Sequence, residues 1–406
     1  MKWPWHVVLF DMVLWFLAIS SGWQVFYVLS YALGILILVG WLWTFPSLQQ
    51  LRCQRTGIPG RAQVGDVLDE ELMLTNLGRL LQPWVEIGDH STVPGHDVSY
   101  VARLGAGQSI SWHAQSHCRQ HGRFRLGPLT ASAGDPFGLF RREIVLVAAR
   151  DLVVLPRVVP LRRLPFIAAT SSSSRRAIPG LLGMTTDIAS IRAYVQGDPR
   201  SRIHARSTAR YGKPMVKAPD TRSRPDVWIV LDLDRRVQVG AGEQSTEAYS
   251  VTLAATIASY GLKHGYGVGV LVNDQQGSRL PVDDSPGQLE RILELLAVAT
   301  PTAGTALSQT IERVAPSFGR NAIIMVITPS PPATWHTTLN RLQICGMEIL
   351  VVALIGASFA EGLAEPDPFA VASGMRIPVI QAKCGETIVE ILERDIEPFS
   401  HNRSYS

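Results

Sequence analysis

One uninterrupted apolar run near the amino terminus constrains this chain more than any other feature. Residues 23–45 read WQVFYVLSYALGILILVGWLWTF and contain no formal charge. At a rise of about 1.5 Å per residue, a helix of this length can cross the ~30 Å hydrocarbon core of a bilayer. We therefore expect a transmembrane helix that is structurally separate from most of the 406-residue chain.

A second apolar stretch precedes this run. Residues 5–20 are mostly apolar, with Asp11 as the one interruption, and Ser21 and Gly22 supply a turn. The pattern predicts a transmembrane helical hairpin over residues 1–50. A cleaved signal peptide is the alternative, because Lys2 and the residues that follow loosely imitate one, but the second run would still anchor the product.

Basic residues flank the hairpin. Lys2 precedes the first run, and Arg52, Arg55 and Arg61 follow the second. Because positive flanks stay on the cytoplasmic side, we expect two transmembrane helices in the inner (cytoplasmic) membrane, with the soluble domains in the cytoplasm. The four cysteines have no CxxC spacing, which agrees with a reducing compartment.

The next hundred residues have the pattern of an all-β domain. Short β-rich runs are separated by Gly, Pro and Asn, which predicts a β-sandwich over residues 51–155. The runs are residues 71–75, 84–87, 98–104, 144–147 and 152–155. Within this region His113, His117 and His121 recur every four residues beside Cys118. In a strand four residues span about 13 Å, so we do not expect these histidines to share one zinc ion.

The last part of the chain alternates apolar runs with helical patterns. Residues 225–406 contain apolar runs at 227–231, 268–272, 322–328 and 348–355, with helical stretches between them. Buried strands separated by helices indicate an α/β (Rossmann-like) domain with a parallel sheet. Ligands bind such sheets at the carboxyl ends of the strands, so the loop after residue 231 is the expected site.

Residues 156–224, between these two domains, are predicted to be a linker followed by a basic segment. Residues 141–224 contain 17 basic and 5 acidic residues, a net charge of +12, whereas residues 225–406 have a net charge of −8. Such asymmetry suggests that the basic segment meets something acidic: a partner protein, anionic lipid, nucleic acid, or the acidic domain of the same chain. Nucleic acid is the least favoured, since the chain lacks the interleaved aromatics of single-strand binders.

Several motifs together resemble one protein family. Residues 192–210 read RAYVQGDPRSRIHARSTAR, residues 121–128 read HGRFRLGP, and residues 135–140 read DPFGLF. These strings are similar to the signature of the DUF58 family of bacterial membrane-anchored proteins, which have a von Willebrand factor A-like C-terminal domain. The resemblance covers the hairpin, the sandwich, the basic segment and the α/β domain.

The family has no established activity, and the resemblance implies association rather than mechanism. Its members are typically encoded with MoxR-type AAA+ ATPases and with transglutaminase-like membrane proteins. The expected function is therefore that of a membrane-anchored, non-enzymatic scaffold or interaction protein that works with such an ATPase.

The basic motif supplies the candidate partner-binding residues. An Asp-Pro pair is a good helix start, and the three arginines that follow at i, i+4 and i+8 would then line one face of a helix. The full set of candidates is Arg192, Tyr194, Gly197, Asp198, Arg200, Arg202, His204, Arg206 and Arg210. A solvated or internally paired face is the alternative for this segment.

The loop after residue 231 stands where von Willebrand factor A domains place Asp-x-Ser-x-Ser, the start of a metal-ion-dependent adhesion site. Asp232 is present and Thr305 stands where the second-loop Thr is expected, but Asp234 and Arg236 replace the two serines and Thr328 replaces the third-loop Asp. A guanidinium opposes cation binding, so we expect a degenerate site without metal or other cofactor, whose carboxylates pair internally with Arg235 or Arg236. A metal-dependent adhesion-type domain is the alternative.

An enzyme is less expected. The sequence contains no GxxxxGK[ST] phosphate loop, no HExxH and no GxSxG. No catalytic residue is predicted, and an uncharacterised hydrolase stays the weakest alternative.

Overall fold

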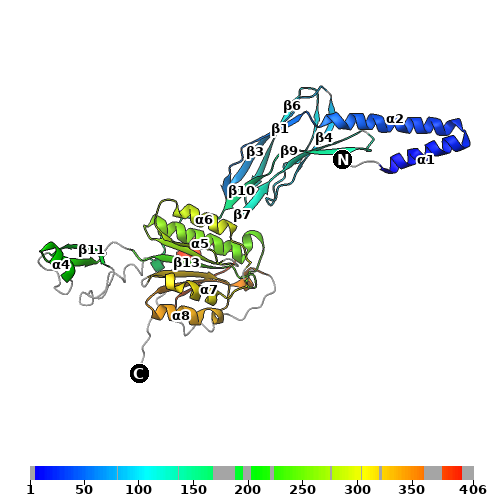
Figure 1. Cartoon of the computed structure of the whole chain (residues 1–406). Coiled ribbons are helices and arrows are strands. Elements are labelled where there is room, and N and C mark those ends of the chain that lie inside the picture. Colours follow the sequence, from blue (N-terminus) through cyan, green and yellow to red (C-terminus); the bar gives the residue numbers. More distant parts are fainter. Residues whose placement is uncertain are drawn as a thin grey trace. The chain divides into compact units, whose positions relative to one another are not determined.

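The chain folds into two compact units, Met1–Pro156 and Arg157–Ser406 (Figure 1). The computed structural model describes residues 5–79, 81–135, 137–167, 188–194, 203–219, 224–274, 277–302, 304–319, 322–360 and 377–395.

The first unit begins with two packed helices, α1 (Trp5–Ser21) and α2 (Gln24–Ser47). Gly22 joins them with a φ of 68°, a left-handed conformation that glycine adopts without strain. Ser30 donates a hydrogen bond of 2.9 Å to Asp11, so the one acid of α1 faces α2. Of the described helices, α2 alone is long and apolar enough to cross a membrane, and α1 is a shorter apolar helix of 17 residues.

Three sheets follow the helices. One contains strands β1-β3-β6, one contains β2-β10-β7, and a four-stranded sheet has the order β5-β4-β8-β9. The strands are β1 Leu51–Thr56, β2 Arg61–Gln63, β3 Val67–Asn76, β4 Gln82–Asp89, β5 Tyr100–Leu104, β6 Ser109–His117, β7 Gly122–Leu126, β8 Leu129–Gly134, β9 Arg141–Val147 and β10 Arg150–Leu155.

The sheets pack face to face around a shared core. In β3 buried and exposed residues alternate, which is the pattern of a strand with one face inward. Leu51 and Leu74 from one sheet pack with Val85, Ile87 and Ala131 from the four-stranded sheet. The structure therefore has packed β-sheets where the sequence predicts a β-sandwich. His113 and His117 lie in the extended strand β6, whereas His121 lies between β6 and β7.

The prediction of a linker is wrong for residues 157–167. Leu164 and Ile167 are each 1% exposed, and the backbone N–H of Val159 donates to the hydroxyl of Thr256. This stretch is packed within the second unit because Leu164, Phe166 and Ile167 are buried there. Residues 168–187 lie outside the described residues.

The basic segment contains an antiparallel strand pair and one short helix. Strand β11 (Ile188–Ala193) pairs with β12 (Met215–Pro219), and α4 (Ala205–Tyr211) lies between them in sequence. Gly212 ends α4 in a left-handed conformation with φ 64°, and its N–H bonds to the carbonyl of Thr208.

A six-stranded sheet of order β15-β14-β13-β16-β17-β18 forms the centre of the second unit. All neighbours are parallel except β15, which is antiparallel to β14. The strands are β13 Val227–Asp232, β14 Val268–Asn273, β15 Arg279–Asp283, β16 Ile323–Thr328, β17 Glu348–Leu354 and β18 Val379–Ala382. The sheet is thus mixed rather than wholly parallel.

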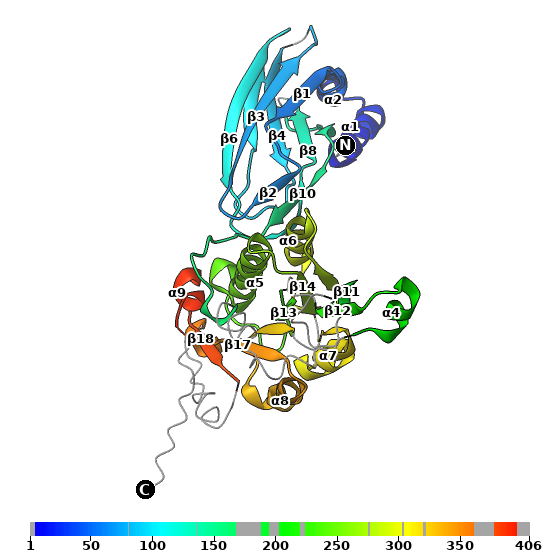
Figure 2. The same ribbon diagram turned by 90° about the vertical axis from the view of Figure 1, so that its left-hand side faces the viewer.

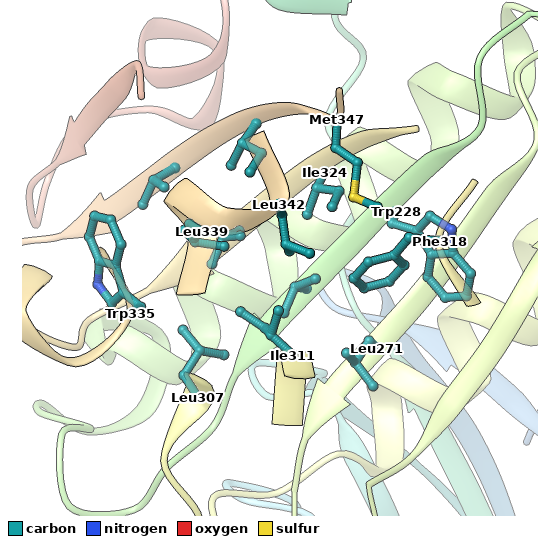
Figure 3. Packing of buried hydrophobic residues seen from close by; sticks show 14 of the residues in the cluster. Trp228, Leu271, Leu307, Ile311, Phe318, Ile324, Trp335, Leu339, Leu342 and Met347 are labelled. Carbon is teal, nitrogen blue, oxygen red and sulfur yellow. The ribbon is translucent and has the colours of Figure 1, made fainter. Parts of the chain in front are cut away.

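Helices cover both faces of this sheet, with α5 and α6 on one side and α7 and α8 on the other (Figure 2). They are α5 Thr246–Lys263, α6 Gln288–Val298, α7 Leu307–Val314 and α8 His336–Ile344, with the short α9 Ile388–Leu392 near the end. Figure 3 shows the core under α7 and α8, where Trp228 and Phe318 meet edge to face with ring centroids 5.1 Å apart. Burial on both faces explains why the central strands are continuous apolar runs.

Candidate functional site

The order of the parallel strands reverses between β13 and β16, which is the position of the ligand crevice in doubly wound sheets. The chain leaves β13 toward β14 on one side and later returns to form β16 on the other. Ligands of doubly wound sheets bind at such a reversal point, outside the carboxyl ends of the strands. Asp232 is the last residue of β13, and Thr328 is the last residue of β16.

The carboxylate of Asp232 is fully buried and surrounded by hydrogen-bond donors. Its Oδ2 accepts from the hydroxyls of Thr328 and Ser330, both at 2.6 Å. Its Oδ1 accepts from the side-chain amide of Asn273 at 3.0 Å and from the backbone N–H of Asp234 at 3.3 Å. A carboxylate offers about four lone-pair positions, so these four donors saturate it.

The donors are themselves held in place. Asn273, the last residue of β14, accepts a hydrogen bond of 2.6 Å from Thr310 and donates a second one, of 3.1 Å, to the backbone carbonyl of Thr305. Thr328 accepts from the backbone N–H of Ser330 at 2.9 Å. The network therefore connects the ends of three adjacent strands and spans the crevice.

Asp234 forms a separate ion pair with Arg236. The guanidinium approaches the carboxylate to 2.5 Å, with its Nε at 3.1 Å from both oxygens. Burial raises the pKa of Asp234, but the hydrogen bonds and charge of Arg236 outweigh burial and lower that pKa below its usual value. The Asp234 side chain is 6% exposed and the Arg236 side chain 65%, so the pair stands at the surface end of the crevice.

The sequence prediction for this loop is half right. The internal pairing expected of the carboxylates holds for Asp234 and Arg236, whereas Asp232 is compensated by neutral donors. Thr305 takes part through its backbone carbonyl, which accepts from Asn273. Asn273 and Ser330 were missed, although a polar residue that ends or follows an apolar parallel strand is a signal of this site.

Groups of the chain itself compensate both carboxylates: hydrogen-bond donors surround Asp232, and Arg236 pairs with Asp234. Among the described residues, no group of three or more His, Cys, Asp or Glu side chains is arranged to hold a metal ion. The Asp232 carboxylate has its hydrogen-bonding capacity filled by groups of the same chain. These hydrogen bonds hold the carboxyl ends of β13, β14 and β16 together.

The basic segment differs from its prediction. Helix α4 begins at Ala205, and its N-cap is His204, whose Nδ1 accepts from the backbone N–H of Ser207 at 3.3 Å. Ile203 instead forms a β-bridge with Val216. Helix α4 therefore begins after Ile203, and of the three arginines expected on one helix it contains Arg206 and Arg210.

Two arginines of the motif remain on one helix face. Arg206 and Arg210 are both exposed, four residues apart on α4. Tyr194 is half-buried and its N–H donates to the carbonyl of Pro214, whereas Arg192 lies in β11 opposite Val216. The other candidates, Gly197, Asp198, Arg200 and Arg202, lie outside the described residues.

A second buried polar cluster lies inside the sandwich. The Arg55 guanidinium pairs with Glu70 at 2.7 Å, and their side chains are 4% and 0% exposed. His96 Nε2 lies 3.1 Å from Arg55 and 3.2 Å from Asp89, while its Nδ1 lies 2.8 Å from the Ser116 hydroxyl. The guanidinium is the cation of this cluster. The sequence position of Arg55 suggested that it belongs to the positive flank of the hairpin. Its burial and its ion pair with Glu70 show that it is a structural residue of the sandwich instead.

Comparison with known proteins supports one family for the second unit. Residues 190–357 match the family model described as "Protein of unknown function DUF58". No curated protein matches the chain.

The solved structures with similarity are distant. The CARDB domain of the PF1109 protein from Pyrococcus furiosus is 19% identical, with a TM-score of 0.21, and covers 26% of this chain and 87% of its own. Proximal thread matrix protein 1 from the mussel byssus is 13% identical, with a TM-score of 0.30, and the match covers 42% of this chain and 46% of that one. Identities this low bear on fold alone, and these TM-scores support no inference about function.

Proposed function

We propose that this protein is a membrane-anchored, non-enzymatic interaction protein, with a von Willebrand factor A-like domain that binds through side chains rather than through a metal ion. The observation that carries this proposal is the saturation of Asp232 by Thr328, Ser330, Asn273 and the backbone of Asp234.

The saturated carboxylate argues against adhesion-type metal binding. A divalent cation needs about six oxygen ligands with free lone pairs, and Asp232 would have to give up several hydrogen bonds to supply one. Arg236 adds a positive charge at the mouth of the same crevice. The hydrogen-bond donors thus stabilise the buried Asp232 carboxylate, as a bound cation would in a metal-dependent site. A partner would then bind to surface side chains and not to a metal ion.

The anchor is the hairpin of α1 and α2. Helix α2 has the length and hydropathy of a membrane span, and α1 packs along it with Asp11 turned toward Ser30. A partly buried acid that is hydrogen-bonded between two apolar helices is compatible with a bilayer around both. We propose that both helices insert and that the two soluble parts of the chain lie in the cytoplasm at the inner membrane.

The partner surface proposed here includes α4. Arg206 and Arg210 are exposed on one face of that helix, in a segment of high positive charge. An acidic protein surface is the complement of such a face, and the family resemblance names a MoxR-type AAA+ ATPase as the candidate, with a transglutaminase-like membrane protein in the same assembly. Exposed ion pairs contribute only ~0–1 kcal/mol each, so binding would rest on several contacts.

The test is affinity purification of the full-length protein from its native membranes, followed by identification of any AAA+ ATPase that is retained. The variant Arg206→Glu/Arg210→Glu should lose the ATPase, because it replaces attraction by like-charge repulsion. The matched control Lys263→Glu/Arg313→Glu makes the same change of charge at two exposed positions on α5 and α7 and should retain it.

Two results would contradict the proposal. If no ATPase is retained with the unmodified protein, the partner is wrong. If the α4 variant keeps the ATPase but unfolds at a lower temperature, these arginines pair within the chain and do not form a docking surface.

A further inference from the structure

We propose that the end of the β-sandwich nearest α2 docks on the lipid bilayer, with Phe137 and Leu77 in the headgroup region. This inference rests on the proposed membrane anchor. It goes further by assigning a lipid-binding surface to the sandwich itself, apart from the helices.

The loop between β8 and β9 packs against α2. The β8–β9 hairpin lies beside α2, and a Cβ added at Gly40 would lie 3.2 Å from the ring of Phe140 and 3.3 Å from the carboxylate of Asp135 (Figure 1). Gly40 is inside the apolar span, which runs from Gln24 to Thr44. Whatever packs on Gly40 is therefore at the level of the last turn of that span.

Hydrogen bonds within the β8–β9 loop hold its conformation against α2. Asp135, 7% exposed, accepts hydrogen bonds from the backbone N–H groups of Phe137 and Phe140, at 2.9 and 2.5 Å. Its charge is thus compensated inside the loop, and Phe140 is buried against α2 at 2% exposure. Phe137 in contrast is 54% exposed, and it lies in the same loop, three residues before Phe140.

The neighbouring loop at this end adds further apolar side chains. Leu77 is tied to the helix junction by a 2.9 Å hydrogen bond from its N–H to the carbonyl of Gln50, three residues after α2 ends. Leu77 is 63% exposed and Leu81 44%, and Trp84, near the start of β4, is 64% exposed. Aromatic and aliphatic side chains gathered at the end of a span are typical of the membrane interface.

Charge separates the two ends of the sandwich. The loops at the α2 end are residues 77–81, 105–108 and 135–140, and among their described residues the one acid is the buried Asp135, while Arg79 is exposed. The loops at the opposite end expose Asp66, Asp97 and Arg119. An apolar end whose one exposed charge among these described loop residues is an arginine suits an anionic lipid surface, and the opposite end, which exposes two acids, suits water.

The experiment uses the full-length protein in lipid nanodiscs, in a background with Cys345→Ser and Cys384→Ser. Cys53 and Cys118 remain because they pack against the core of the sandwich. One added cysteine at a time replaces Phe137, Val67 at the opposite end, or the exposed Ile35 in the middle of α2, and each carries an environment-sensitive fluorophore. Spin-labelled lipids with the quencher at the headgroup or deep in the acyl chain then report depth.

We expect the label at Phe137→Cys to emit further to the blue than the label at Val67→Cys and to be quenched most by the headgroup quencher. The label at Ile35→Cys should be quenched most by the deep quencher. Leu77→Cys serves as a second reporter for the same surface, so that a local effect of replacing Phe137 cannot decide the result alone.

The possible failures are distinguishable. If Ile35→Cys is quenched deeply but Phe137→Cys and Leu77→Cys behave like Val67→Cys, the docking surface is refuted and the anchor stands. If Ile35→Cys itself behaves like Val67→Cys, α2 is not inserted, and both the anchor and the docking surface are refuted.

Discussion

Removing the Asp232 carboxylate should destabilise the second unit far more than removing a surface acid. In Asp232→Ala, the amide of Asn273 and the backbone N–H of Asp234 lose their acceptor and cannot turn elsewhere, since both are fixed by other bonds or by the chain. The hydroxyls of Thr328 and Ser330 can rotate to other acceptors.

Each buried donor left without a partner costs about 1–3 kcal/mol. Two fixed donors, with a smaller contribution from the two hydroxyls and the space left by the side chain, give a loss of about 3–5 kcal/mol for Asp232→Ala. In Asp232→Asn the amide oxygen still faces Asn273 and the backbone of Asp234, and the new NH₂ group faces two hydroxyls that can turn to accept. The expected loss is then about 1–2 kcal/mol, from weaker hydrogen bonds.

The assay is equilibrium urea unfolding of the full-length protein in detergent, followed by tryptophan fluorescence. Trp228 and Trp335 report the second unit because both are buried in its core. Asp284→Ala, at an exposed acid of the same unit, is the control and should change the free energy of unfolding by less than about 0.5 kcal/mol. Equal losses for Asp232→Ala and Asp232→Asn, or a loss below about 1 kcal/mol for Ala, would refute the saturated network.

Three further outcomes are expected. Mg²⁺ or Mn²⁺ should leave the melting temperature unchanged, because a site-bound ion would raise it with concentration, and a saturable rise that Asp232→Ala abolishes would contradict this. A topology reporter fused after Ser406 should signal the cytoplasm, and a signal from the exterior would favour an external body. Burial lowers the pKa of His121 to about 4 from 6.5, so between these values the unfolded chain binds a proton that the folded chain does not. Stability of the first unit should therefore fall by up to about 3 kcal/mol as pH drops through that window, and denaturant midpoints of His121→Gln should lose this slope.

The fold of the second unit could be predicted largely from the sequence, because strands buried on both faces leave continuous apolar runs. Strands β15 and β18 were missed since each is short and lies at or beside a proline, which interrupts the pattern. The place of the site followed from Asp232 at the end of an apolar run, but its partners did not. Ser330 and Asn273 are single polar residues, and only the parallel register of β13, β14 and β16 brings them to one carboxylate.

The limits of α4 show why spacing alone is a weak guide. Arginines four residues apart satisfy helical periodicity whether or not the residues before them are helical, and side-chain spacing holds no information about where a helix begins. The N-cap interaction of His204 with Ser207 sets that start, and histidine is an uncommon choice for the position.

The edges of the six-stranded sheet limit how this protein can assemble with others. Strand β15 is five residues long and contains Pro281, and β18 is four residues long and follows Pro378. Short edge strands with proline offer few N–H groups to a strand of another chain, which protects a sheet from joining its neighbours edge to edge. Lateral extension of the six-stranded sheet into fibrils, or recruitment of a partner strand at its edges, is therefore disfavoured.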